Sequence, residues 1–304
     1  MSAVETPLLV KPPRLRWQAD LALGFVALIW GLTFVVVKAA LNDISTMYFL
    51  ALRFGFASLC MTPMLIPVFR AAGARSVWTG IGGGLLAGLF LWAGYLLQTF
   101  GLNYTSAGNS GFLTGLYIVL VPLISAAWYR KWPRVSELVG IAIATAGMSI
   151  LTIPSLDRSF RFNRGDLLTV GCAVAFAFHL LVVGYFSARQ RFEAVAFGQI
   201  LCAAGLSGLA LFFEPPTVAW TGRTIFAILL TGLFATALAF ALQTWGQQYT
   251  SPTRTALLFA LEPVFAILAA ITYGGEHLTV YSAAGGSLIL AGVLTVELKP
   301  GQSA

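Results

Sequence analysis

Two titratable side chains lie inside long apolar stretches of the sequence, where a charge is costly. Glu262 falls near the middle of the stretch 254–273, and His179 falls deep in the stretch 167–187. An ionised carboxylate in hydrocarbon costs about 2.5 to 3.5 kcal/mol even on lenient insertion scales. Glu262 is therefore either a site for a proton or a substrate amine, or a hydrogen-bonded group at the helix irregularity that Pro263 imposes. His179 is either a proton carrier or a neutral, hydrogen-bonded core histidine.

Aromatic and amide side chains recur at helical spacing in two further stretches, 78–99 and 224–246. Tyr95 and Gln98 share one face of the first, and Phe240 and Gln243 hold the matching positions of the second. This pattern predicts either the wall of a cavity for an aromatic or amphiphilic solute or packing seams joined by interhelical hydrogen bonds. The candidate substrate-binding residues are Trp30, Trp92, Tyr95, Gln98, Tyr117, His179, Phe240, Gln243 and Glu262.

Three basic residues lie within or at the ends of apolar stretches. Lys38 and Arg53 flank Asp43, so they either pair with it or snorkel, or else form a cationic vestibule for a carboxylate. Arg254 begins the stretch 254–273, where we expect it to hold a gate through Glu262 or to anchor lipid phosphate. Two helical turns separate Arg254 from Glu262, which disfavours direct pairing.

The elements that must position these residues follow from composition. The chain of 304 residues is 58% hydrophobic and only 10% charged, which excludes a soluble protein of this length. A spanning helix needs roughly 20 apolar residues. Apolar runs without strand-like alternation exclude a membrane barrel. The sequence therefore predicts an all-α integral membrane protein with ten transmembrane helices, near 19–39, 46–69, 78–99, 109–128, 136–153, 167–187, 194–213, 224–246, 254–273 and 279–297.

The chain carries an internal duplication. Residues 97–106 read LQTFGLNYTS and residues 242–251 read LQTWGQQYTS, which are identical at seven of ten positions. The polar segment 153–166 divides the helices five and five, and because five is odd the second half must enter the membrane from the opposite side. We expect two inverted five-helix repeats, 19–153 and 166–297. A linker at 154–165 and tails at 1–18 and 298–304 complete the chain.

Basic residues indicate the orientation. With the amino terminus inside, the inner segments carry eleven Lys and Arg residues and the outer loops carry four. We therefore expect a multi-pass protein of a bacterial inner membrane with both termini cytoplasmic. The net charge of +7 then reflects topology and anionic lipid. It does not indicate nucleic-acid binding, because the charges form no patch on a soluble domain.

Several short motifs resemble the ten-span drug/metabolite transporter superfamily, in particular its EamA-type exporters. They are Trp30-Gly31 with Phe34 and Lys38, Arg53-Phe54, Tyr104 to Ala107, and Leu261-Glu262-Pro263. The resemblance covers essentially the whole chain. It implies a monomeric exporter of small metabolites that works by alternating access through a central cavity between inverted halves. The aromatic candidates make the chain most similar to the amino-acid exporters of that superfamily.

The expected function is export of amino acids, including aromatic ones, with nucleotides, vitamins and amphiphilic drugs as alternative substrates. An intramembrane enzyme acting on lipid is the competing class, but the sequence contains no HExxH, GxSxG or clustered interfacial aspartates. We expect no catalytic residue, no metal ion and no cofactor. The expected partners are a small-molecule substrate and the lipid bilayer.

Overall fold

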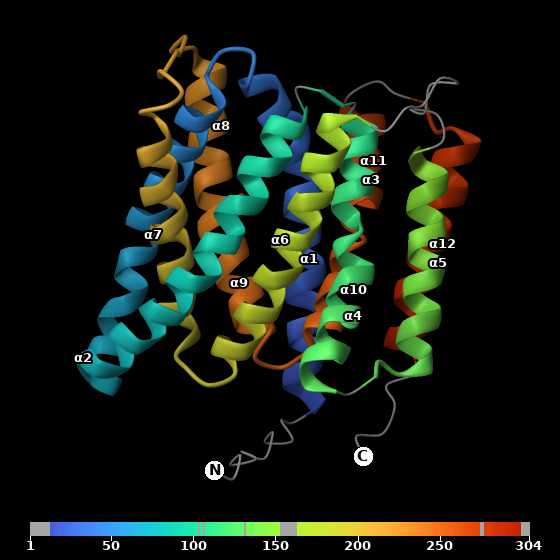
Figure 1. Ribbon diagram of the computed structural model, residues 1–304, viewed down its shortest axis with the longest axis horizontal. Coiled ribbons are helices and arrows are strands. Elements are labelled where there is room, and N and C mark those ends of the chain that lie inside the picture. The colour runs from blue at the N-terminus through green and yellow to red at the C-terminus, as the bar shows by residue number, and fades with distance from the viewer. Residues whose placement is uncertain are drawn as a thin grey trace.

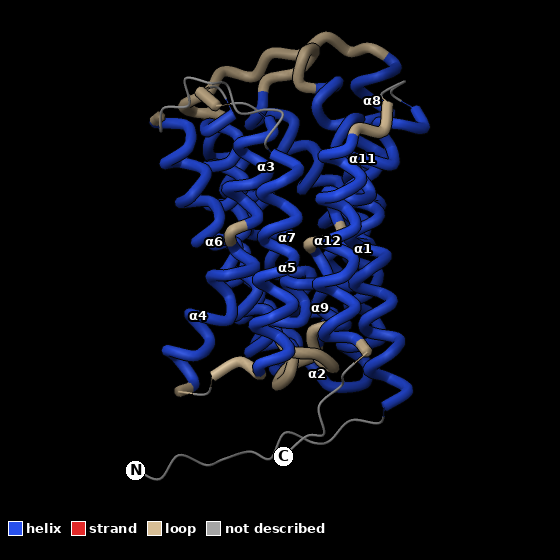
Figure 2. The backbone as a smooth tube through the Cα atoms, turned by 90° about the vertical axis from the view of Figure 1, so that its right-hand side faces the viewer, coloured by secondary structure: helices blue, strands red, loops and turns tan. Residues whose placement is uncertain are grey.

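The computed structural model describes residues 13–102, 104–105, 107–130, 132–152, 163–273 and 277–298. Helices run roughly parallel between two faces at which the loops gather (Figure 1, Figure 2). The helices are α1 Pro13–Ala40, α2 Thr46–Leu102, α3 Ala107–Gly115, α4 Tyr117–Tyr129, α5 Val135–Thr152, α6 Arg164–Ser187, α7 Phe192–Ala210, α8 Gly222–Gly232, a π-helix Leu233–Leu238, α9 Ala239–Gly246, α10 Pro252–Phe259, α11 Glu262–Tyr273 and α12 Val280–Glu297. We call the face at which α1 ends and α2 begins the upper face, and the opposite face the lower face.

The helix α2 contains two membrane spans. Nine segments of the described chain are long and apolar enough to cross a membrane, and one of them, Thr46–Gly101, has 56 residues. A straight helix of that length would extend about 84 Å, far more than the hydrocarbon core of about 30 Å. Gly73 interrupts it with a φ of 75°, a left-handed conformation that glycine adopts without strain. Figure 1 shows α2 descending to the lower face and returning, so the chain crosses the membrane ten times.

The ten spans form two inverted halves, as the duplication predicts. The first copy of the repeated motif ends α2 at the upper face, and the second copy ends α9 at the lower face (Figure 1). Two spans break at equivalent repeat positions. One passes from α3 to α4 between Gly115 and Tyr117, and the other passes from α10 to α11 between Phe259 and Glu262. Such broken helices are typical of transporter sites near the membrane centre.

The remaining predicted boundaries stay predictions. The first helix begins at Pro13, within the range 1–18 for which a tail is expected, and proline is favoured in the first turn of a helix. Residues 1–12 and 299–304 lie outside the described residues, as do position 153 of the first repeat and positions 154–162 of the linker. Asn163, within the range 154–165 for which a linker is expected, caps α6, and its side chain accepts hydrogen bonds from the N–H groups of Gly165 and Asp166.

Glycines allow helices of the two halves to approach closely. A Cβ atom at Gly140 would lie 2.7 Å from the carbonyl oxygen of Gly292, and one at Gly147 would lie 2.6 Å from that of Gly285. These pairs join α5 to α12. A Cβ at Gly84 in α2 would lie 2.3 Å from the carbonyl oxygen of Val195 in α7. Small residues at such positions are the usual means of helix association in membranes.

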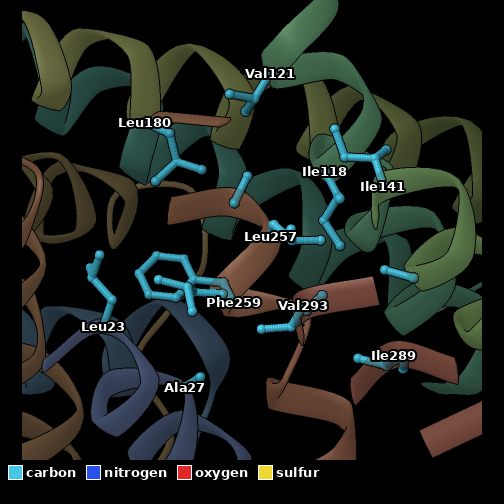
Figure 3. Packing of buried hydrophobic residues seen from close by; sticks show 14 of the residues in the cluster. Leu23, Ala27, Ile118, Val121, Ile141, Leu180, Leu257, Phe259, Ile289 and Val293 are labelled. Atoms are coloured by element: carbon cyan, nitrogen blue, oxygen red, sulfur yellow. The ribbon is translucent and has the colours of Figure 1, made fainter. Parts of the chain in front are cut away.

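A buried apolar cluster holds the broken spans in place. Figure 3 shows side chains of α1, α4, α5, α6, α10 and α12 meeting around Leu257 and Phe259. The short helix α10 contributes fully or nearly fully buried side chains from Ala256 to Phe259. Its position, and with it that of the break before Glu262, is therefore fixed by packing on both halves.

Replacing Gly84 with alanine tests the close helix contact. We expect Gly84→Ala to lower thermal stability, because overpacking a tight contact typically costs about 1 to 3 kcal/mol. Gly82→Ala is the matched control, since a Cβ there meets nothing within 4 Å and the site is exposed. Thermal unfolding in detergent, followed by loss of the monodisperse chromatographic peak, provides the measurement. Equal stability of the two variants would contradict the assigned contact.

Candidate functional site

A cavity of about 510 Å³ lies where the two halves meet, within the range usual for small-molecule sites. It is lined by residues of α1, α2, α3, α4, α6, α9, α10 and α11, and it reaches the exposed Asn42 at the upper face. Eight of the nine predicted site residues line it: Trp30, Tyr95, Gln98, Tyr117, His179, Phe240, Gln243 and Glu262. The structure thus brings them together, and their contact with a substrate stays a prediction.

Trp92 is the ninth candidate and does not line the cavity. Its neighbour Leu91 lines the cavity, and successive helical side chains point about 100° apart. The indole of Trp92 packs instead against an apolar cluster that includes Phe54 and Ile200. Its location inside an apolar stretch therefore reflects packing.

The π-helix supplies an anchoring carbonyl to the cavity wall. In an α-helix the N–H of Ala239 would bond the carbonyl of Ala235, but here it is directed to those of Phe234 and Thr236. The carbonyl of Ala235 instead accepts from Trp30 Nε1 at 2.9 Å and from Arg53 Nη2 at 3.2 Å. A local widening of one helix in the second half thus orients two side chains of the first half.

Arg53 is buried beside the cavity and has no acidic partner among the described residues. Its Nε donates to Thr236 Oγ1 at 2.6 Å, and its guanidinium lies 5.6 Å from the ring centre of Tyr95. These contacts orient the cation without neutralising it. The expectation that Arg53 pairs with Asp43 is wrong, because Asp43 pairs with Arg223 at 2.7 Å. The side chain of Lys38 lies outside the described residues.

Glu262 begins α11 directly after the break in its span. The alternative of a hydrogen bond at the Pro263 irregularity finds no support, because no described residue forms a hydrogen bond or an ion pair with the carboxylate. The carboxylate lines the cavity, and its place in the first helical turn lets the helix dipole offset part of its desolvation. Tyr95 lines the same cavity.

Two amide side chains complete the polar part of the lining. Gln98 donates from Nε2 to Thr114 Oγ1 at 3.2 Å. Gln243 donates from Nε2 to Gln247 Oε1 at 3.2 Å. Its own Oε1 is buried without a hydrogen-bond partner in the described chain. Gln243 lines the cavity as a residue, but its side chain is fully buried.

His179 belongs to a buried relay that the sequence did not reveal. Its Nε2 lies 2.7 Å from Gln199 Oε1, and Gln199 Nε2 donates to Thr244 Oγ1 at 2.9 Å. The Thr244 hydroxyl donates to the carbonyl oxygen of Phe240 at 2.7 Å. The available sequence signal was weak: Gln199 is a solitary amide in an apolar stretch, and Thr244 adjoins the predicted Gln243.

Ion pairs lie near both faces of the protein. Near the lower face, Arg254 is 5% exposed and pairs with Asp20 at 2.8 Å and with Glu297. The cluster joins α1, α10 and α12, so the expectations of a gate through Glu262 and of a lipid anchor are both replaced by this ion-pair network. At the upper face the exposed Arg223 lowers the pKa of Asp43 by donating hydrogen bonds to it.

The two ion-pair sites predict different responses to the same substitution. Arg254→Gln leaves two carboxylates near the lower face without their counter-ion, and breaking a buried pair typically costs about 3 to 5 kcal/mol. Arg223→Gln removes a largely exposed partner, and we expect little loss of stability. Thermal unfolding of both variants in one detergent checks this. A larger loss in Arg223→Gln would contradict the assignment of the buried cluster.

Comparison with known proteins places this architecture among transporters. The sequence model of the EamA-like transporter family matches residues 17–153 and 163–298. An uncharacterized transporter of Archaeoglobus fulgidus is 35% identical over 284 residues, covering 93% of this chain and 87% of the relative. A probable amino-acid metabolite efflux pump of Salmonella typhimurium is 26% identical over 287 residues, covering 89% and 93%. One crystal structure matches with a TM-score of 0.77 at 22% identity, covering 93% of this chain and 97% of that chain, and it supports the fold alone.

Proposed function

This chain belongs to the EamA-like transporter family, and from that premise we propose that it exports amino acids, apolar and aromatic ones in particular. The observation that carries the proposal is a cavity lined by one cation, Arg53, and one carboxylate, Glu262, neither of which has a charged partner among the described residues. The proposed site is Trp30, Tyr95, Gln98, Tyr117, His179, Phe240, Gln243 and Glu262, with Arg53 added.

The two charges match the two ends of a zwitterion. A substrate carboxylate pairs with the Arg53 guanidinium, which keeps donors free beyond those used on Thr236 and Ala235. A substrate ammonium pairs with Glu262, which lines the same cavity. Because Arg53 and Glu262 both line the cavity yet form no ion pair with each other, a small molecule can bridge them.

Aromatic rings provide the apolar part of the proposed site. The ring centre of Trp30 lies 4.9 Å from that of Phe259 and 5.4 Å from that of Phe240. The Trp30 indole is fixed by its bond to Ala235, so the wall it forms with these rings is rigid. Apolar and aromatic side chains gain most from such a wall.

Transport requires that the cavity open alternately to each face. The cavity reaches the upper face. The cluster of Arg254, Asp20 and Glu297 lies toward the lower face. With the termini cytoplasmic, the upper face is the outer one, and the structure corresponds to the state that releases an exported substrate. Inverted repeats allow a second packing of similar energy that opens the lower face. Uptake of substrate from the cytoplasm then requires the Arg254 cluster to separate.

Phosphorylated metabolites fit the cavity less well than amino acids. Among the described residues that line it, Arg53 is the single cation, and Glu262 repels a second negative charge. Nucleotides and phosphorylated vitamins carry several negative charges. Neutral or cationic amphiphilic drugs would leave Arg53 without a counter-ion.

Liposome transport with matched analogues tests the proposal. We expect saturable uptake of labelled phenylalanine, inhibited by unlabelled phenylalanine and much less by phenethylamine or 3-phenylpropionate, which each lack one charge. Arg53→Gln should raise the KM for phenylalanine at least about tenfold, because a charge-assisted hydrogen bond contributes about 1.5 to 3 kcal/mol. Arg53→Lys should retain more activity. Glu262→Gln should likewise weaken transport of phenylalanine.

Controls separate binding from folding in this test. Each variant is reconstituted only after it elutes as a monodisperse peak, and Trp92→Phe serves as a matched substitution outside the cavity. Flux equal to that of empty liposomes with folded protein would contradict amino-acid transport. Equal inhibition by all three ligands would contradict recognition of both charges.

A further inference from the structure

The relay behind His179 fixes the position of one proton. A threonine hydroxyl has a single hydrogen, and Thr244 donates it to the carbonyl oxygen of Phe240. Thr244 Oγ1 can therefore only accept from Gln199, so the amide nitrogen of Gln199 must face Thr244. The amide oxygen then faces His179 Nε2. Because that oxygen can only accept, Nε2 carries a hydrogen.

The other ring nitrogen of His179 is consequently a hydrogen-bond acceptor. The side chain is 3% exposed and forms no ion pair with any described residue, so a charged imidazolium would be costly. A neutral imidazole has one N–H, which is on Nε2, and Nδ1 keeps a lone pair. Within the described chain no group donates to Nδ1, and His179 lines the cavity.

This acceptor borders the aromatic wall of the proposed site. The ring centre of His179 lies 6.0 Å from that of Phe240, and Phe240 lies 5.4 Å from Trp30. A substrate side chain held by these rings therefore lies next to the imidazole ring of His179. Gln199 and Thr244 do not line the cavity and act as positioning residues.

We propose that His179 presents Nδ1 as a fixed hydrogen-bond acceptor and so selects amino acids whose side chains carry a donor, a hydroxyl or an indole N–H, over those with a plain phenyl ring. The inference rests on the proposed amino-acid transport. A buried polar group left unpaired by the wrong substrate is an effective basis for discrimination. Phenylalanine would leave Nδ1 without a donor, whereas tyrosine or tryptophan would supply one.

The selectivity is tested by comparing transport of tyrosine and phenylalanine in liposomes. In the parent protein we expect kcat/KM for tyrosine to exceed that for phenylalanine about tenfold. Thr244→Val removes the acceptor for the Gln199 amide, which can then turn and place its nitrogen against Nε2. With the Gln199 nitrogen against Nε2, His179 carries its hydrogen on Nδ1. The preference for tyrosine should then disappear. Thr231→Val is the matched control, because that buried threonine bonds only the carbonyl of Ala227 in the same span.

A spectroscopic measurement reads the tautomer directly. The chain has two histidines, so His277→Gln leaves His179 as the single one, and the protein is purified through a histidine-free tag. Nitrogen-15 NMR of labelled protein should show the Nε2–H form in this parent and in Thr231→Val, and the Nδ1–H form after Thr244→Val. An imidazolium or an Nδ1–H form in the parent would overturn the proposal.

The outcomes distinguish this inference from the proposed function. Uptake of both amino acids without preference for tyrosine would overturn the selectivity while leaving amino-acid transport intact. A preference that survives Thr244→Val with an unchanged NMR spectrum would overturn the role of the relay. Folded parent protein without any amino-acid uptake would overturn the proposed function and the selectivity with it.

Discussion

A charge inside a bilayer must be compensated, and the way each buried charge is compensated organises this protein. Arg254 is neutralised by Asp20 and Glu297, and the resulting cluster ties α1, α10 and α12 together near the lower face. Arg53 and Glu262 are treated differently. The Arg53 guanidinium donates hydrogen bonds to Thr236 and Ala235 and lies over the ring of Tyr95. Glu262 lies at the amino terminus of α11. Both contacts hold a charge in place and leave it available to a ligand beside the cavity.

The duplication explains why these two charges come from different halves. The breaks at Gly115–Tyr117 and Phe259–Glu262 occupy equivalent positions of the repeat, yet the first presents the phenol of Tyr117 and the second presents a carboxylate. Arg53 belongs to the first half and is anchored by the π-helix of the second. A ligand that bridges Arg53 and Glu262 therefore contacts both halves. Any movement between the halves changes the separation of the two charges, which links binding to the opening of either face.

Much of the fold and part of the site could be predicted from the sequence. Ten apolar stretches and a repeated decapeptide define the inverted spans, because span length and repeat symmetry are properties of the linear sequence. Polar and aromatic residues at helical spacing identified eight of the residues that line the cavity. The sequence could not identify three features. Arg254 pairs with Asp20, which is 234 residues away. The π-helix frees the carbonyl group of Ala235, and a buried relay runs through Gln199 and Thr244. These features depend on how separate helices rotate and pack, which residue spacing does not determine. Trp92 illustrates this limit. It is one residue away from the cavity-lining Leu91, and its side chain therefore points away from the cavity.

Recognition of a zwitterion between the two halves is tested by the distance between a bound amino acid and the two charged side chains. Solid-state NMR of phenylalanine labelled with carbon-13 at its carboxyl, bound to protein labelled with nitrogen-15 in its arginine guanidinium groups, reports that contact. We expect dipolar dephasing typical of a charge-assisted hydrogen bond of about 2.8 Å between nitrogen and oxygen, and we expect Arg53→Gln to abolish it. The reverse labelling, nitrogen-15 in the ligand and carbon-13 in glutamate, should give the same result for Glu262. A bound ligand that shows neither contact would contradict recognition of a zwitterion between the two halves.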